Sequence, residues 1–247
     1  MPRTVPEESD TLCESCGYTL NGLPGDSNCP ECGQPIVHST QADGRGLTGF
    51  ERRPGASSFL ATTVAVLARP KRFYRGIVTR TDHPAAGWFA QRHRLIAAAL
   101  FSAAAVGYAK WLAETAGRGF LLRRLVWDQL ASVVLAGALF AVVFGLMTGL
   151  TRLAAWLSAL EGRYWGMRLP QPAVLRCLQY HTACYLPVGI VAVLAVWGYR
   201  LMLRTGLVSW ATALYYPWIL SALVIVSAGY LFRQYMIAMR SIRFANR

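Results

Sequence analysis

One stretch of the chain carries no charge and few polar groups: Leu130 to Leu150 reads LASVVLAGALFAVVFGLMTGL. A helix of about 20 such residues is long enough to cross the hydrocarbon core of a bilayer. Within lipid a chain must satisfy its own backbone hydrogen bonds, and the sequence shows no alternating barrel pattern, so a helix is the expected form. This stretch therefore predicts a membrane fold.

Three further apolar segments resemble it, on either side along the chain. With Leu130 to Leu150 they predict four spans, near residues 95–113, 130–150, 182–199 and 208–232. The composition agrees, because 54% of the residues are hydrophobic and only 15% are charged, against about a quarter charged in a soluble domain. We expect an all-α integral membrane helical bundle of about four spans over residues 95–247.

The basic residues predict an orientation. With the N-terminus inside, nineteen Lys and Arg lie on the inner side of the four segments and five on the outer side. The positive-inside rule then places both termini in the cytosol. The first ten residues, MPRTVPEESD, contain no secretory signal, so we expect the N-terminal region to stay in the cytosol and the protein to lie in an inner (cytoplasmic) membrane. A net charge of +13 fits anionic lipid, because the basic residues flank the apolar runs.

A shorter apolar segment precedes the spans, within residues 57–94. Ser57 to Ala68 is too short to cross a bilayer and runs into Arg69-Pro-Lys-Arg-Phe-Tyr-Arg75. An interfacial helix fits, with Phe73 and Tyr74 at the headgroups and the arginines on anionic lipid. A plain juxtamembrane loop fits equally well. Residues 39–56, which are polar and rich in glycine, are expected to form a linker.

Residues 10–38 contain two matching cysteine motifs, Cys13-Glu-Ser-Cys16-Gly and Cys29-Pro-Glu-Cys32-Gly. Four thiolates suit a tetrahedral Zn²⁺. A glycine after each second cysteine lets the backbone turn so that amide N–H groups point at sulfur. We expect a small zinc ribbon with rubredoxin-like knuckles and short β-structure. A module of this size cannot build a sufficient core, so metal binding would supply its folding free energy.

Other uses of these cysteines remain open: two disulfides, a CxxC redox pair, or an iron site. A reducing cytosol disfavours disulfides, and the βαβ context of a redox pair is missing. A structural Zn²⁺ on Cys13, Cys16, Cys29 and Cys32 is the preferred interpretation. Because all four ligands would come from the protein, no position is left for catalysis.

Two stretches of this sequence carry a resemblance to known proteins. The segment 13–33, CESCGYTLNGLP followed by CPECG, resembles the ribbon that precedes several transmembrane helices in a group of bacterial membrane proteins. The segments ARPKRFYR at 68–75 and LRCLQYHTACYLP at 175–187 resemble the Yip family of Ypt/Rab-interacting membrane proteins. That family usually has five spans, against the four predicted here. The resemblance implies a membrane scaffold or adaptor.

Several residues near the spans could carry chemistry. Cys177, His181 and Cys184 share a helix face and could form a second metal site, although packing explains them as well. Lys110 and Glu114 could relay protons, or form a local ion pair with Lys110 extended to the interface.

Three other features of the spans have a structural and a functional interpretation. Asp128 is expected to be an anion at a helix N-terminus. Pro187 and Pro217 could mark bent helices lining a pathway. Small residues recur every four positions in the first two spans, which suits packing within the bundle or a homo-oligomer; they are Ala99, Ala103, Gly107, Gly137, Ala141, Gly145 and Gly149.

The sequence contains no familiar catalytic signature. We expect a non-enzymatic membrane scaffold or adaptor whose cytosolic ribbon binds a protein partner through Tyr18, Leu20 and Leu23. The alternative is a small transporter or channel-like protein. Nucleic acid is an improbable partner, because residues 12–37 contain no Lys or Arg and a phosphate-binding surface needs positive charge.

Overall fold

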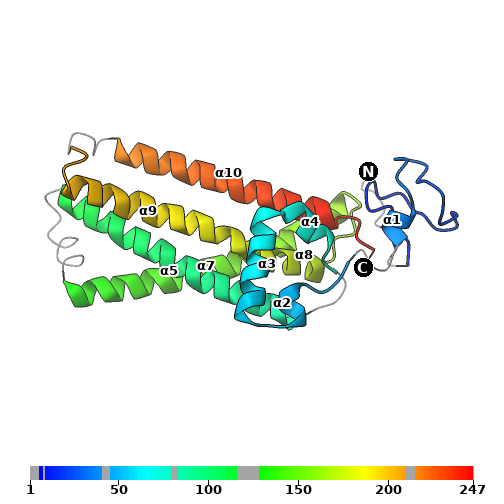
Figure 1. Ribbon diagram of the computed structural model, residues 1–247, viewed down its shortest axis with the longest axis horizontal. Helices are drawn as coiled ribbons and strands as arrows, with labels where there is room; N and C mark the ends of the chain where they lie inside the picture. Colours follow the sequence, from blue (N-terminus) through cyan, green and yellow to red (C-terminus); the bar gives the residue numbers. More distant parts are fainter. Residues whose placement is uncertain are drawn as a thin grey trace. The chain divides into compact units, whose positions relative to one another are not determined.

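The computed structural model describes residues 6–7, 9–40, 45–78, 83–115, 128–209 and 215–246. Within these ranges the chain is helical, and isolated β-bridges take the place of a sheet. Figure 1 shows the order of the helices, from α1 in blue to α10 in red. Arg118, Arg123 and Arg124, which entered the count of charges for the orientation, lie outside the described residues.

Four helical stretches are long and apolar enough to cross a membrane, which confirms the predicted number. They are α5 (Pro84–Thr115), α7 (Gln129–Tyr164), α8 (Gln171–His181) with η2 (Thr182–Cys184) and α9 (Tyr185–Arg204), and α10 (Tyr216–Ile242). The first three extend beyond their predicted spans. The fourth is predicted to start at Val208, but α10 starts at Tyr216 and continues past Phe232 to Ile242; residues 210–214 of the predicted span lie outside the described residues. Helix propagation adds one hydrogen bond per residue, so a helix continues past the apolar stretch until a breaker or a tertiary contact ends it.

Four shorter helices precede them: α1 (Val37–Thr40), α2 (Gly49–Arg52), α3 (Ala56–Ala68) and α4 (Pro70–Arg75). The basic segment Pro70–Arg75 is thus helical, and the alternative of a plain loop is wrong. Tyr74 of this helix has no exposed surface and Phe73 packs on Tyr180, with ring centroids 5.3 Å apart. The prediction that Tyr74 reaches the lipid headgroups is therefore wrong, since its ring contributes to the protein interior.

The chain forms two compact units. The first comprises Met1–Ala90, Leu150–Ala183 and Arg233–Arg247, and the second comprises Gln91–Gly149 and Cys184–Phe232.

The interior of the first unit is aromatic. Phe89 packs against Phe50, Phe59 and Tyr180 with ring centroids 5.6, 5.2 and 5.0 Å apart. Two of the contributing residues, Phe50 and Phe89, have almost no exposed surface. Pairs with this geometry add about 0.5–1.5 kcal/mol each beyond their buried area. The segment expected to be a linker thus provides Phe50 to this core.

A buried ion pair lies in the same unit. Thr48 and Glu51 form a capping box at the start of α2, and Glu51 pairs with Arg176 of α8 at 2.7 Å, with both side chains buried. Burial alone would raise the pKa of Glu51, but the hydrogen bonds and charge of Arg176 and the Thr48 N–H lower it below its usual value. The Thr48 hydroxyl also lies 2.9 Å from the Tyr180 hydroxyl.

The second unit is held together by a close approach of α5 and α9. A Cβ at Gly107 would lie 2.8 Å from Val196 and 2.9 Å from Trp197, so only glycine allows these helices to pack so tightly. The Trp197 indole N–H donates to the Ala103 carbonyl at 3.0 Å. Gly107 is therefore a packing contact within the bundle, whereas Ala99 and Ala103 of the same stripe are exposed.

Glu114 pairs with Arg200 of α9 at 2.7 Å, and Arg200 also donates to the Gly107 carbonyl at 3.1 Å. The prediction of a local Lys110–Glu114 pair is therefore wrong. A buried guanidinium needs an anion more than a half-buried lysine does; Arg200 is buried and Lys110 is half-buried.

The structure also places the aspartate, the two prolines and the glycines that the sequence marked in the spans. Asp128 accepts a hydrogen bond from the Ala131 N–H at 3.1 Å, which confirms its role at the start of α7. Pro187 and Pro217 lie in the first turns of α9 and α10, where proline costs no hydrogen bond. On α7 a Cβ at Gly137, Gly145 or Gly149 would have no neighbour within 4 Å among the described residues.

Candidate metal centre

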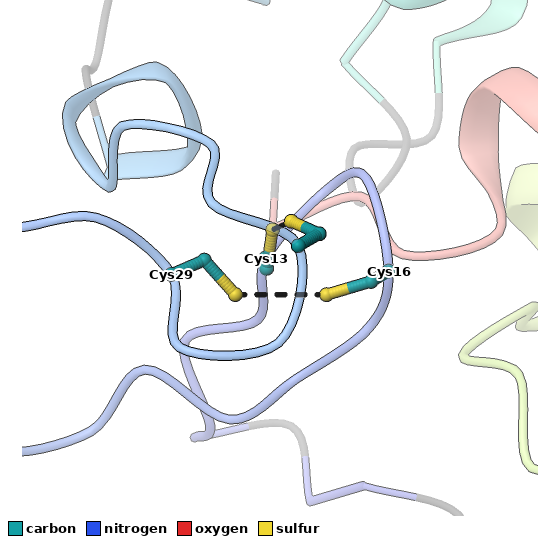
Figure 2. Close-up of side chains that lie close together, drawn as sticks. Cys13, Cys16 and Cys29 are labelled. Carbon is teal, nitrogen blue, oxygen red and sulfur yellow. Dashed lines mark hydrogen bonds between the residues drawn. The ribbon is translucent and has the colours of Figure 1, made fainter.

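Four thiols converge near the N-terminus of the first unit (Figure 2). The Sγ atoms of Cys13 and Cys32 are 3.6 Å apart, as are those of Cys16 and Cys29, and all four lie within 4.8 Å of one another. A tetrahedral ion with bonds of about 2.3 Å places its sulfur ligands about 3.8 Å apart. A disulfide requires a separation of about 2.05 Å, and all four cysteines are free. The thiols are thus placed to hold a metal ion.

Two copies of one backbone structure, the knuckles Cys13–Tyr18 and Cys29–Gln34, position these thiols. In each, the N–H of the first cysteine donates 2.8 Å to the carbonyl of the last residue, Tyr18 or Gln34. In each, the glycine N–H donates 2.8 Å to the carbonyl of that first cysteine. A single antiparallel bridge joins the residues on either side of each knuckle, Leu12 with Thr19 and Asn28 with Pro35. The repeated CxxCG motif is therefore accompanied by a repeated backbone structure.

The glycines have the conformation that the motif requires. Gly17 has φ +86° and Gly33 has φ +71°, in the left-handed region that strains residues with a Cβ. The turn points the next amide at the second cysteine, so that the N–H of Tyr18 bonds Cys16 and that of Gln34 bonds Cys32. Such bonds orient metal-binding sulfurs and stabilise their charge.

The surroundings shift the pKa values of Cys29 and Cys16 in opposite directions. Burial would raise the pKa of Cys29, but the N–H groups of Cys32 and Glu31 and the adjacent thiols lower it to about 7. The pKa of Cys16 is raised, chiefly by burial and by the neighbouring thiols. Four thiolates this close repel one another, so full ionisation needs a cation among them. The donor set fits a cation that prefers sulfur.

The ribbon has only a minimal core of its own. Cys13, Leu20, Cys29 and Ile36 are buried together, with Leu23 packed against them. Leu20 is therefore unable to reach a partner, and of the three residues predicted to do so only Tyr18 is well exposed, at 40%. So small a core agrees with a fold that depends on metal.

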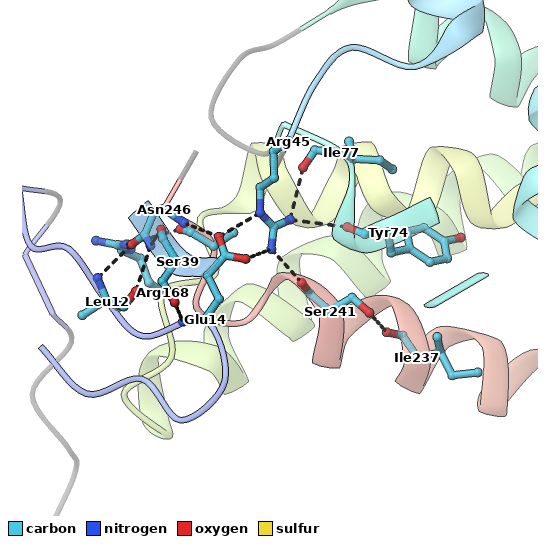
Figure 3. Close-up of polar contacts among 11 residues, drawn as sticks. Leu12, Glu14, Ser39, Arg45, Tyr74, Ile77, Arg168, Ile237, Ser241 and Asn246 are labelled. Carbon is cyan, nitrogen blue, oxygen red and sulfur yellow. Dashed lines mark hydrogen bonds and ion pairs between the residues drawn. The ribbon is translucent and has the colours of Figure 1, made fainter. Parts of the chain in front are cut away.

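The first knuckle is bound to the rest of its unit through Glu14 (Figure 3). The Glu14 carboxylate accepts two hydrogen bonds of 2.9 Å from Arg45. The same guanidinium donates to the carbonyls of Ile77, after α4, and Ser241, in α10, at 3.2 and 3.1 Å. Arg45 therefore joins the ribbon, the α4 region and the end of α10. Nothing local in the sequence marks this arginine, which lies in the segment expected to be a linker.

The C-terminal segment covers the same knuckle. Asn246 exchanges two hydrogen bonds of 2.8 Å with the Leu12 backbone and donates a third of 2.8 Å to the Ser39 carbonyl. Arg168 donates to the Asn246 side chain at 2.8 Å. Figure 3 shows Asn246 and Arg168 meeting the chain beside Leu12. The ribbon is thus a docked part of the first unit.

The other predicted cluster is not assembled. Cys177, His181 and Cys184 are all buried. Within the ranges that the structure describes, only the four cysteines of the ribbon form a group able to hold a metal ion. The hypothesis of a second metal site therefore has no support, and these residues serve as packing.

Comparison with protein-family models, curated proteins and solved structures finds no match to this chain. The Yip family is accordingly not identified, and the four clustered cysteines are the part of the resemblance that the structure supports.

Proposed function

We propose that this chain is an integral membrane adaptor whose zinc ribbon presents one open knuckle to a protein partner. The proposal rests on one difference between two knuckles of the same backbone structure: the first is covered by the rest of the chain, and the second is open. The protein's own chain covers the first at Leu12, Glu14 and Gly17. At Gly33 of the second knuckle, an added Cβ would touch no neighbour within 4 Å among the residues that the structure describes.

Membrane insertion is supported by which apolar residues are exposed. None of the most apolar window of α7 is buried, and Leu130, Val133 and Val134 are each more than 60% exposed. A soluble protein rarely exposes so large an apolar surface, whereas lipid satisfies it. We place the protein in a bacterial inner membrane with both termini in the cytosol, following the distribution of Lys and Arg.

Zinc is the proposed metal because four thiolates form a closed tetrahedral site that suits it. Its role would be structural: Cys13, Cys16, Cys29 and Cys32 would hold it, and the bonds would stabilise both knuckles. The site has no position for a substrate, so the ribbon is proposed as a binding module and the protein as non-enzymatic.

The open knuckle can be tested by site-specific photocrosslinking in cells that produce the full chain. A photoreactive residue at Glu31, which is exposed, should yield one defined protein adduct, and the adduct should disappear in Cys29→Ser. The matched control is the same residue at Arg53, also exposed but outside the ribbon. Equal adducts at both positions, or none at Glu31, would contradict the proposal.

One observation favours the alternative of a small transporter. Glu114 and Arg200 form an ion pair between two apolar helices of the second unit, and charges within spans often serve ion or proton movement. Proton or substrate flux in proteoliposomes that stops in Glu114→Gln would support a transporter. Absence of flux in the wild type would leave Arg200 with a packing role.

A further inference from the structure

A cavity of about 850 Å³ lies in the first unit, bordered by the ribbon, α4 and the last turn of α10. Its size suits a small-molecule ligand, since such sites measure about 300–1,000 Å³. Most of its charged lining residues are cationic: Arg45, Lys71, Arg75, Arg240 and Arg243. Its carboxylates come from Asp10 and Glu14.

Those two carboxylates already have partners. Asp10 accepts hydrogen bonds from the Glu7 N–H at 3.0 Å and from the Asn21 side chain at 2.8 Å. Glu14 is bound to Arg45 by two bonds of 2.9 Å. Only Glu14 is paired with a cation, while Asp10 keeps its charge, so two carboxylates face five cations and the lining is positive overall.

The remaining cations lack anionic partners. Lys71, Arg75 and Arg240 are exposed and form no ion pair or side-chain hydrogen bond with any described residue. Arg243 donates to the Ser15 carbonyl at 3.0 Å, but its Nε is buried and has no hydrogen-bond partner among the described residues. Three exposed cations and one unsatisfied guanidinium nitrogen thus surround one space.

Stabilisation of helix ends accounts for only part of this arrangement. Arg75 and Arg240 lie in the last turns of α4 and α10, where a cation interacts favourably with the helix dipole. Lys71 lies in the first turn of α4, where the dipole disfavours a cation. The convergence of residues from α4 and the C-terminal segment calls for an anion.

We propose that this cavity binds a phosphate group through Lys71, Arg75, Arg240 and Arg243. Guanidinium and ammonium groups form strong charge-assisted hydrogen bonds with phosphate oxygens. Residues of α4, the end of α10 and the ribbon surround the site, so it is a pocket. A row of basic residues along one helix would not enclose a ligand in this way.

The adjoining surface favours a phospholipid as the source of the phosphate. A second cavity, of about 860 Å³, shares Lys71 and Arg75 with the first. It is bordered also by the apolar residues Ala68, Pro70 and Ile237. An anionic lipid would place its phosphate among the cations and its glycerol and first methylenes on this apolar side. This choice of source rests on the proposed membrane insertion, whereas the phosphate site itself does not.

The test measures binding to the full chain, purified in non-ionic detergent, by calorimetric titration. The probes are dihexanoyl-phosphatidylglycerol, dihexanoyl-phosphatidylcholine and inorganic pyrophosphate. The test variant is Arg75→Gln/Arg240→Gln, and the matched control is Arg53→Gln/Arg163→Gln, which removes the same charge from exposed arginines outside the cavity. Both variants should retain the metal content and melting temperature of the wild type, because these side chains have no partners to lose.

We expect phosphatidylglycerol to bind the wild type and the control equally, and the test variant at least about tenfold more weakly. Phosphatidylcholine, without net charge, should bind more weakly than phosphatidylglycerol. Binding of pyrophosphate alone would retain the site and assign it to a soluble phosphate compound. No binding of either anion, or an equal loss in the control, would overturn the proposal. Failure of membrane insertion would show separately, as a protein that stays in solution without detergent.

Discussion

The two knuckles of the ribbon share a motif and a backbone structure but differ in what surrounds them. A Cβ at Gly17 would lie 2.6 Å from the Phe244 ring, whereas a Cβ at Gly33 would meet nothing within 4 Å. Glu14, directly after the first cysteine of its knuckle, is bound to Arg45, whereas Glu31, one position later in the second knuckle, is exposed. The difference teaches that local sequence determines a knuckle's geometry, while distant parts of the chain determine whether it is buried or free.

The largest effect is expected from the loss of one cysteine, and it should be the same in either knuckle. Cys13→Ser and Cys29→Ser should each abolish metal binding and unfold residues 10–38, because in such sites metal binding, about 10–16 kcal/mol, is the folding free energy. Elemental analysis and limited proteolysis would measure this. If one variant kept its metal and its protease resistance, the knuckles would not share a single ion.

The next effect should differ between the knuckles, because it depends on whether the glutamate that is removed has a partner. Glu14→Ala leaves Arg45 with a buried charge and no anion, at a cost of about 1–3 kcal/mol because the pair is partly exposed. Glu31→Ala removes an exposed side chain and should change stability by less than about 0.5 kcal/mol. Hydrogen exchange of the ribbon amides reports both values, and equal protection in the two variants would contradict the docking of the first knuckle.

A smaller effect tests the close contact at Gly17. Gly17→Ala and Gly33→Ala both introduce a Cβ at positive φ, at about 1 kcal/mol each. Gly17→Ala should cost about 1 kcal/mol more because Phe244 must move. In a double-mutant cycle followed by thermal unfolding, Phe244→Ala should remove this excess. Equal costs for the two glycines would show that Phe244 does not press on the knuckle.

The last effect is a pH dependence, and it concerns the buried Glu51–Arg176 pair of the first unit. The pKa of Glu51 is lowered in the folded protein, so its stabilisation is complete above its ordinary pKa of about 4.3 and is lost as the pH falls through the lower, folded value. Glu51→Gln should remove this acid-dependent loss from melting curves in detergent between pH 3 and 6. Because acid also releases metal from thiolates, the comparison with wild type must hold metal content constant.

Much of this architecture follows from local patterns. Uncharged runs predict the four long helices, and the CxxCG spacing predicts the convergence of four thiols. The polar contacts between distant segments do not follow: Asn246 meets Leu12 and Arg200 meets Glu114 because of the tertiary fold. Arg176, one of the nineteen inner charges in the count for the orientation, is buried opposite Glu51. No local signal in the sequence identifies such pairs.

The central claim is that the four thiols hold one structural zinc ion. Elemental analysis of the full chain purified in detergent, wild type beside Cys13→Ser/Cys32→Ser, tests it most directly. We predict one zinc per chain in the wild type and none in the double variant. Iron in the wild type, or no metal with the four thiols paired as disulfides, would contradict the account.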